Sequence, residues 1–527
     1  MNNLYVFAIG GSGERVVKSL VMMLSTGMNI GAQRVIPVFI DNDEQSCAYQ
    51  KCKDLIKYYN ANPNTDRGKM GANTLYKRFN PDPSSWGSFF HVQIDDPIIL
   101  NRTGEAIGDL KRVIGYVRGE SEVHKAVEEE MNLLFTNDDL TMPLNVGFVG
   151  NPNIGSIVLN TLSLQDQAFK KIMNGITPDD GVIAVGSLFG GTGAAGMPLI
   201  INTFKNLELA KKPVIGGVAV LPYFTTDGKS KDNLALDASK WDVKSDAFLT
   251  KTRAALMYYD EHMKLGYDYM YYVGDSKSTD VYEHCRGGAK QDNPYHIIEV
   301  MSALSVIDFS YNGHQDDIVY KSPVFGFIAS DDTNTTLRAN LSGITNSDFA
   351  KSIVKFQIMK EMFERANQDD YMLKWAIDNR ANYVANIGFD ETCRKSVIGT
   401  SQAWSQAWGL CELMKEFDVW MKDLSNDKIR RPFVLYNNNE AVNADNITTK
   451  FFTENKFGIA LSKMEGIFNR HEAPVKANIA DEMLKAYKRL YSGKKLDDIK
   501  TDDTLPMLLN TISEALDEVM KKNCIVL

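Results

Sequence analysis

Residues 181–204, GVIAVGSLFGGTGAAGMPLIINTF, decide the fold of this chain. An apolar run is followed by the loop Gly190-Gly191-Thr192-Gly193 and then by apolar residues at helical spacing, which predicts a strand, a glycine turn and a helix. Glycines in such a turn let backbone N–H groups come close to an anion, and the N-terminus of the helix adds partial positive charge. The stretch therefore predicts a phosphate-binding turn at the end of a buried strand.

The same pattern occurs at the N-terminus. Residues 4–9 are apolar, Gly10-Gly11-Ser12-Gly13 follow, and residues 14–24 carry apolar side chains at helical spacing. Taken alone, this loop has three interpretations: a phosphate-binding turn, a turn that only reverses the chain, and the G-x-G-x-x-G fingerprint of a nicotinamide dinucleotide site. The fingerprint needs a third glycine for close packing of helix on strand, and Val16 stands in its place. The sequence therefore disfavours a dehydrogenase.

A second apolar run, residues 35–40, ends in a polar segment that contains Asp41 and Asp43. A buried parallel strand delivers polar side chains to the carboxyl edge of its sheet in this way. Further strands are predicted at residues 144–149, 181–185, 214–221 and 269–273, with helical stretches between them. This alternation predicts a doubly wound α/β domain over residues 1–320.

Helical periodicity dominates the chain beyond about residue 324. Helical segments are predicted at residues 347–377, 400–424, 455–468, 478–491 and 505–521. Polar stretches separate them. The pattern predicts a second, largely helical domain over residues 321–527.

Composition bounds the class of protein. The chain has 527 residues, of which 44% are hydrophobic and 24% charged, so it can bury the cores of two or three domains. The net charge of −9 argues against a broad nucleic-acid-binding surface. The six cysteines lack the spacing of a disulfide framework or a zinc site, which predicts a reducing, cytoplasmic setting.

Two further features concern membranes. The longest mainly apolar run, residues 213–224, is too short to cross a bilayer, so we expect no membrane association. The last four residues, Cys524-Ile525-Val526-Leu527, formally match a prenylation motif. An apolar tail that completes a strand or a partner contact is the favoured interpretation.

Residues 181–204 resemble the signature of the tubulin/FtsZ superfamily, and Pro198 stands where FtsZ-type proteins carry a proline in the signature helix. Two departures accompany this match: Phe189 replaces the first glycine of GGGTG[ST]G, and Ala194-Ala195 replace the hydroxyl residue and the last glycine. The resemblance implies a Rossmann-type GTPase domain with a parallel sheet and a long central helix, followed by a divergent C-terminal domain. An insertion at about residues 80–145 is untypical of bacterial FtsZ and resembles the divergent bacterial tubulin-like group.

Other nucleotide loops of the superfamily have counterparts in the same order along the chain. Residues 10–13 resemble the first phosphate loop, residues 41–45 the polar stretch after the second strand, and residues 68–73 the loop over the γ-phosphate. Residues 218–223 resemble the strand before the ribose contacts, for which Asp227 and Lys231 have the right spacing. The nucleotide-binding residues that the resemblance implies are Gly10, Gly11, Ser12, Gly13, Asp41, Asp43, Gly71, Gly190, Gly191, Thr192, Gly193, Ala194, Asp227, Lys231, Asp275 and Asn293.

Residues 292–309 resemble the long central helix of the superfamily, with Asn293 at its start. In the superfamily an asparagine at this place contacts the guanine edge, and a carboxamide offers the donor and the acceptor that this contact needs. Asn293 also fits the N-cap of a helix that has Pro294 in its first position. The two roles are compatible.

The resemblance implies GTP or GDP with Mg²⁺ as ligands and head-to-tail self-assembly into filaments. In the superfamily, acidic residues after the central helix of one subunit polarise the water that attacks GTP bound to the next subunit. Asp316 and Asp317 lie at the corresponding distance from Asn293, although the NxDxxD motif is not reproduced. A carboxylate can position water and hold a cation, and paired aspartates in a polar loop can also be merely solvated. GTP hydrolysis at this shared site is the expected activity.

The alternative function is a scaffold locked around its nucleotide, in which GTP braces the fold permanently and the helical C-terminal part binds a protein partner. The substitutions Ala194-Ala195 and the missing NxDxxD motif favour this alternative. Such a scaffold would suit a multi-component bacterial defence-type system. Neither function requires a metal site built from protein residues alone or a nucleic-acid partner.

Overall fold

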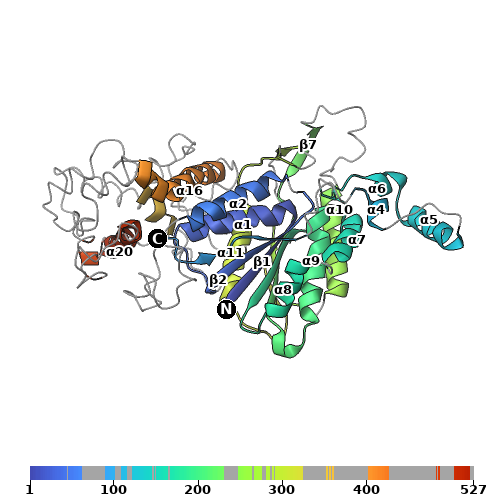
Figure 1. Ribbon diagram of the computed structural model, residues 1–527, viewed down its shortest axis with the longest axis horizontal. Helices are drawn as coiled ribbons and strands as arrows, with labels where there is room; N and C mark the ends of the chain where they lie inside the picture. The colour runs from blue at the N-terminus through green and yellow to red at the C-terminus, as the bar shows by residue number, and fades with distance from the viewer. Residues whose placement is uncertain are drawn as a thin grey trace, which may run out of the picture.

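The computed structural model of the chain describes most of residues 1–323 and two helices beyond them (Figure 1). The described residues are 1–43, 45–61, 89–100, 108–114, 121–144, 147–148, 150–163, 166–230, 247–263, 266–275, 281–284, 288–289, 291–323, 401–425 and 504–522, with short pieces within 352–360 and 482–489. Residues 68–73, which include Gly71, lie outside the described residues, and so does Lys231.

The centre of the molecule is an eight-stranded sheet in which all strand pairs are parallel. Its strands are β1 (Asn3–Ile9), β2 (Arg34–Ile40), β3 (Gln93–Ile94), β4 (Ile98–Leu100), β5 (Gly181–Ser187), β6 (Val214–Val220), β8 (Tyr269–Val273) and β10 (Val319–Lys321). They lie in the order β10-β8-β6-β5-β1-β2-β3, and β4 also pairs with β2. A separate parallel pair consists of β7 (Thr225–Ser230) and β9 (Val281–His284). The expected α/β class with a parallel sheet is therefore confirmed.

Helices cover both faces of the sheet (Figure 1). One face carries α1 (Gly10–Ser25), α2 (Cys47–Asn60) and α11 (Ile297–Ser310), and the other carries α7 (Pro152–Ser163), α8 (Gln167–Gly175), α9 (Gly191–Lys205) and α10 (Phe248–His262). Strand β1 shows why, because Leu4, Val6 and Ala8 belong to one core cluster whereas the alternate residues Tyr5, Phe7 and Ile9 belong to the other. Strands with two apolar faces require cover on both sides.

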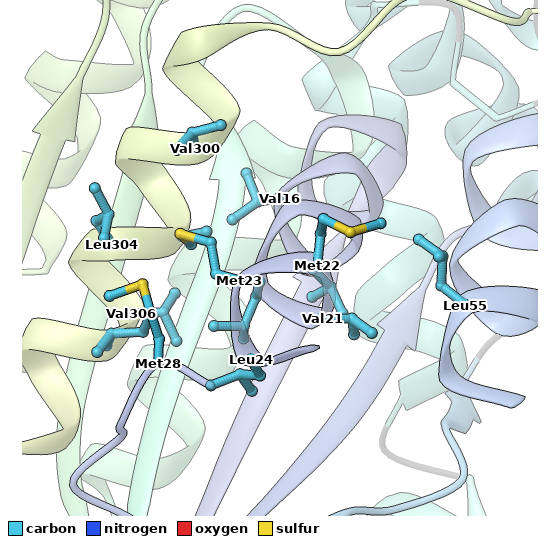
Figure 2. Packing of buried hydrophobic residues seen from close by; sticks show 14 of the residues in the cluster. Val16, Val21, Met22, Met23, Leu24, Met28, Leu55, Val300, Leu304 and Val306 are labelled. Atoms are coloured by element: carbon cyan, nitrogen blue, oxygen red, sulfur yellow. The ribbon is translucent and has the colours of Figure 1, made fainter. Parts of the chain in front are cut away.

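The core on the α1 face is rich in methionine and branched aliphatic side chains (Figure 2). Met22 points from α1 toward Leu55 of α2, and Met23 points toward Leu304 of α11. All four side chains are buried. Helix α1 therefore contributes apolar side chains to two neighbouring helices at once, which fixes its position above β1.

The C-terminal half contributes helices α16 (Ser401–Ser425) and α20 (Thr504–Lys522), near two of the predicted segments. Both belong to the core cluster of the α1 face, through Phe417 and Trp420 of α16 and Leu516 of α20. Trp408 of α16 packs edge to face on Tyr58 of α2, with ring centroids 5.4 Å apart. The predicted segments at residues 455–468 lie outside the described residues, as does most of 347–377 and 478–491.

The segment at about residues 80–145 contains β3, β4 and three helices: α4 (Leu110–Val113), α5 (Glu122–Leu134) and α6 (Asn137–Thr141). Of the strand predicted at residues 144–149, the structure describes Leu144, Gly147 and Phe148, and none of these three belongs to a strand of the eight-stranded sheet. Leu144 and Phe148 are buried in the second core cluster, which explains the apolar run. Between them Gly147 has a φ of +87°, a backbone conformation that favours glycine.

Two helix starts differ from the sequence prediction. Helix α1 begins at Gly10 and not at Glu14, so the first glycine loop forms its first turn. Helix α11 begins at Ile297, because His296 is its N-cap and makes a capping box with Glu299. The N-cap role predicted for Asn293 is therefore wrong, and the central helix has 14 residues.

Candidate functional site

The sheet has a topological switch point between β1 and β5, where the chain leaves neighbouring strands toward opposite faces. After β1 the chain enters α1 on one face, and after β5 it enters α9 on the other. The order β3-β2-β1-β5-β6-β8 has the same pattern as doubly wound nucleotide-binding sheets, whose ligands bind outside the carboxyl ends at such a point. Both predicted glycine loops stand at this place.

The first loop, residues 10–13, contacts the second loop directly. Gly10 has a φ of +71°, and a Cβ added to it would lie 3.1 Å from Thr192 Cβ. A Cβ on Gly13 would lie 2.6 Å from the carbonyl oxygen of Val185, inside the sheet. Gly11 differs, because a Cβ there would meet no heavy atom within 4 Å. Gly11 is thus the glycine of this loop that borders open space.

The second loop is packed tightly against the protein itself. A Cβ on Gly193 would lie 2.6 Å from the backbone nitrogen of Ser187, and one on Gly191 would lie 2.9 Å from the backbone nitrogen of Asn151. A Cβ on Gly190 would lie 2.6 Å from the hydroxyl of Ser187. These glycines are required by the close approach of neighbouring backbone, whether or not a ligand approaches as well.

Helices α1 and α9 begin at these loops with no capping side chain and no acidic residue in the first turn. Elsewhere in the described chain caps are common: Ser46 caps α2, Ser121 caps α5, Asp166 caps α8 and His296 caps α11. The first N–H groups of a helix lack intrahelical acceptors and carry the positive end of its dipole. Two uncapped N-termini in contact therefore bring two sets of backbone donors together at the switch point.

A third loop, which sequence analysis missed, lies between the second glycine loop and Asp41. Its described residues are 147–148 and 150–151, and Gly150 and Asn151 lie against Gly191. On its other side, a Cβ on Gly147 would lie 3.6 Å from Asp41 Oδ1. Asn151 Oδ1 accepts hydrogen bonds from the first turn of α7. The sequence signal was present, since two glycines precede an Asn-Pro helix start.

Asp41 and Asp43 follow β2 at the same edge, and both are buried. Asp41 Oδ1 accepts a hydrogen bond of 2.7 Å from the backbone N–H of Asn42. Asp43 accepts one from the backbone N–H of Gln45 at 3.0 Å and one from that of Gly288 at 2.6 Å. Backbone N–H groups hold the two carboxylates in place. Each carboxylate keeps further lone pairs that can accept, but the two do not form a set of metal ligands by themselves.

Among the described residues, no group of three or more His, Cys, Asp or Glu side chains could hold a metal ion. Mg²⁺ that is bound through phosphates needs no such cluster, because one or two carboxylates assist the phosphates and several waters remain on the ion. Asp41 and Asp43 have the donor chemistry for that arrangement. The residues present fit the ion when the phosphates come with it.

Phe189, Ala194 and Ala195, which depart from the pattern GGGTG[ST]G, are buried in the protein. The Phe189 side chain lies in an aromatic cluster, with its ring centroid 4.8 Å from that of Phe248 and 5.6 Å from that of Phe224. Ala194 and Ala195 are buried in the first turn of α9, and the carbonyl of Ala194 accepts a hydrogen bond from Tyr259. None of these side chains fills the open space beside Gly11 at the switch point.

Asn293 reaches the same edge through Arg15 of α1. The Arg15 guanidinium donates to the carbonyl of Pro294 at 2.7 Å and to that of Asn293 at 3.3 Å, and it forms a buried ion pair with Glu299. Glu299 also accepts a hydrogen bond from Tyr223 at 3.1 Å. Burial alone would lower the pKa of Arg15, but the Glu299 carboxylate raises it above its ordinary value. The helix that follows the first glycine loop thus fixes the backbone that carries Asn293.

Asp275 and Asp227 are two other predicted contacts. Asp275 follows β8, is half-buried, and donates its backbone N–H to the carbonyl of Pro222 after β6. Asp227 lies within β7. Asp275 is thus two strands away from the switch point, on the side of β6 and β8.

Asp316 and Asp317 lie at the opposite edge. Both are exposed and precede β10. The preceding residue, Gln315, donates its backbone N–H to Asp268, which precedes β8. Ser310 at the end of α11 accepts a hydrogen bond from the backbone N–H of Gly31 before β2. These contacts place the predicted catalytic pair at the amino edge of the sheet, far from the glycine loops of the same chain.

The sequence of this chain matches no family model and no curated protein. Within the described residues, no helix combines the length and the apolar character that crossing a bilayer would need.

Proposed function

We propose that this chain is a tubulin/FtsZ-like protein that binds a guanine nucleotide at the carboxyl edge of its sheet. The observation that carries the proposal is the contact between two uncapped helix N-termini, those of α1 and α9, at the switch point. A phosphate chain is the acceptor that both sets of free N–H groups match. The strand order supports the same place for a nucleotide.

Each part of the ligand has candidate partners in the chain. The backbone N–H groups of Gly11, Ser12 and Gly193 would donate to phosphate oxygens, which Gly11 leaves room to approach. Asp41 and Asp43 would hold Mg²⁺ together with the phosphates, and the ion would neutralise phosphate charge. On this assignment the protein contributes position and hydrogen bonds.

Asn293 is the proposed contact for the base. Arg15 holds its backbone carbonyl, so the carboxamide starts from a fixed position. Asn293→Ala should weaken GTP binding by roughly 1–3 kcal/mol, the cost of a buried polar edge left without a partner, and should leave ATP binding little changed. Calorimetric titration with both nucleotides measures this difference. Equal GTP affinity in a variant that is still folded by circular dichroism would remove Asn293 from the site.

Hydrolysis on this proposal needs two subunits. Asp316 and Asp317 lie at the amino edge, whereas the glycine loops lie at the carboxyl edge. The 14 residues of α11, which run between the edges, rise about 21 Å at about 1.5 Å per residue. A carboxylate that acts on the nucleotide must therefore come from a neighbouring subunit, and a head-to-tail contact that does not close builds filaments.

The decisive measurement is GTP hydrolysis per molecule as a function of protein concentration. We expect it to rise steeply with concentration, and we expect Asp316→Ala with Asp317→Ala to bind GTP and assemble without hydrolysis. Hydrolysis that is independent of concentration, or undiminished in the double variant, would contradict the shared site.

A nucleotide-locked scaffold is the second candidate. It is favoured by Ala194 and Ala195, which are buried against the protein and offer no hydroxyl to the phosphates. The nucleotide released from the purified protein separates the two candidates. GDP would indicate turnover, bound GTP would indicate locking, and the absence of any guanine nucleotide would count against both.

A further inference from the structure

The segment that carries Asn293, residues 291–296, forms neither a helix nor a strand. Such a segment keeps its shape only through contacts with its surroundings. Helix α1 supplies one contact, since Arg15 donates to the carbonyl of Asn293. Helix α2 supplies another, an ion pair of 2.7 Å between Lys51 and Asp292. The position of Asn293 therefore depends on side chains from distant parts of the chain.

A third contact comes from the C-terminal half of the chain. Asp423, in the last turn of α16, accepts a hydrogen bond of 3.0 Å from the backbone N–H of Tyr295. Asp423 is half-buried, and Tyr295 is buried. A hydrogen bond from an N–H group to a carboxylate is stronger than one between neutral groups. Because Tyr295 is two residues from Asn293, this bond fixes the backbone on the other side of Asn293 from the preceding ion pair.

Helix α16 is packed firmly enough to impose this position. Near its N-terminal end, a Cβ on Gly409 would lie 2.5 Å from the carbonyl oxygen of Tyr58, near the end of α2. Farther along, Phe417 and Trp420 are fully buried. Figure 1 shows α16 beside α2. Since the start of α16 lies at the end of α2, the two helices run in opposite directions, and α16 brings Asp423 to the carboxyl edge of the sheet.

Attraction between charges favours the same docked position of α16. Glu416 and Asp423 are seven residues apart and thus lie on one side of the helix. Burial raises the pKa of the Glu416 carboxyl, and the charges of Lys51 and Lys18 oppose that rise. Repulsion from Asp292 acts on Glu416 as well, but it is smaller than either attraction. The same two lysines attract the Asp423 carboxylate.

We propose that Asp423 is a positioning residue for the base contact, which makes α16 part of the nucleotide site. This inference rests on the proposed function, because Asn293 is a base contact only if a guanine nucleotide binds at this edge. It adds a coupling between the two halves of the chain. A partner that draws α16 away from α1 and α2 would weaken guanine-nucleotide binding, and bound nucleotide would stabilise the docked α16 to the same extent.

Calorimetric titration with GTP measures the coupling. Asp423→Ala removes the acceptor, and the affinity for GTP should fall by about fivefold or more, the lower end of the usual range of coupling between separate sites. Asp423→Asn keeps an acceptor oxygen and should bind GTP nearly as the wild type does. Asp418→Ala is the matched control. Asp418 lies on another side of α16, where it pairs with Lys360 at 2.9 Å, so its loss should leave the affinity unchanged.

Combination with Asn293→Ala separates positioning from a merely structural role. If Asp423 acts through Asn293, then Asp423→Ala should cause no further loss of GTP affinity in the Asn293→Ala variant, whereas independent losses would add. Additive losses, or wild-type affinity in the single variant Asp423→Ala, would overturn this inference and leave the proposed function intact. A wild type that binds no guanine nucleotide would overturn both.

Hydrogen exchange without nucleotide tests the contact itself. The amide of Tyr295 should exchange faster in Asp423→Ala than in the wild type, and at the wild-type rate in Asp423→Asn and Asp418→Ala, because only the first variant lacks the acceptor. Addition of GTP to the wild type should slow exchange in α16, and this effect should be lost in Asp423→Ala. An equal rate at Tyr295 in all four proteins, or α16 exchange that GTP does not change in the wild type, would overturn the inference.

Discussion

The β1–α1 and β5–α9 units have the same local pattern of strand, glycine turn and helix, yet they differ in what surrounds the glycines. In β5–α9, a Cβ on Gly191 or Gly193 would collide with neighbouring backbone. In β1–α1, Gly11 borders open space. A glycine in a sequence therefore indicates close approach, but only the fold tells whether the approaching group is the protein itself or something that the protein binds.

The helices of the two units differ in the same sense. Near the start of helix α9, Ala194 and Ala195 are buried, and Ala195 belongs to the second core cluster. Helix α1 buries Glu14, Arg15 and Lys18 within its first three turns. Buried charges are costly unless they are paired. The β5–α9 unit is thus packed with apolar residues, whereas the β1–α1 unit carries buried charged groups.

The largest expected loss of stability comes from replacing Arg15 in the β1–α1 unit. Arg15→Met leaves the Glu299 carboxylate buried without its partner, and removal of one member of a buried pair costs about 3–5 kcal/mol. Urea unfolding measures the loss. Arg34→Met is the matched control, since its ion pair with Asp95 is exposed and should cost at most about 1 kcal/mol. Equal losses in the two variants would show that burial of the Arg15 pair contributes nothing.

Lys18 of the β1–α1 unit makes the stability of the protein depend on pH. Its ammonium lies 3.8 Å from the ring centroid of Tyr295, and burial, with a further contribution from Arg15, lowers the pKa of Lys18 from 10.5 to about 8. Between these two pH values the unfolded lysine holds a proton that the folded one has released, so the stability of the wild type rises with pH.

Lys18→Met removes this dependence. A shift of one pKa unit corresponds to about 1.4 kcal/mol. Between pH 8 and pH 10.5, the unfolding free energy of the wild type should therefore rise by about 3 kcal/mol relative to that of the variant. Urea unfolding of both proteins at each pH gives the difference, from which the titration of other groups cancels. Lys53→Met, at an exposed position of α2, is the control and should follow the wild type. If the unfolding free energies of the wild type and Lys18→Met changed with pH in parallel, the lowered pKa of Lys18 would be refuted.

In the β5–α9 unit, Gly193→Ala should destabilise the protein by about 1–3 kcal/mol, the usual cost of an extra methyl group in a well-packed interior. The added Cβ would lie 2.6 Å from Ser187 N, which is backbone and cannot rotate away. Urea unfolding without nucleotide is the measurement. A variant as stable as the wild type would show that the loop opens readily and that the two units are alike.

Some of these features could be predicted from the sequence, and others could not. The β1, β2 and β8 strands follow from apolar runs that end in glycine or acidic residues, and the β5 and β6 strands follow from their apolar runs alone, because buried parallel strands have few other possible patterns. The start of α11 does not follow, since Pro294 favours a start there and the capping box of His296 with Glu299 prevails. The loop before α7 was missed because Leu144 and Phe148 are apolar at strand spacing and are buried without joining the sheet. Whether a glycine contacts protein or solvent depends on residues distant in the chain, which no local pattern contains.

The smallest expected change in stability, and the sharpest test of the comparison, is Gly11→Ala. Its Cβ meets nothing within 4 Å, so the unfolding free energy should change by no more than about 0.5 kcal/mol. If phosphate approaches this backbone, the methyl group stands in its way, and nucleotide affinity should fall at least about tenfold, which corresponds to about 1.4 kcal/mol. Gly175→Ala, at the end of α8, also points into open space and should change neither quantity. Calorimetric titration with GTP and urea unfolding of the three proteins give both quantities. Unchanged affinity in Gly11→Ala would mean that the open glycine of the β1–α1 unit borders only solvent, and the phosphate site would then have to be sought elsewhere along the carboxyl edge.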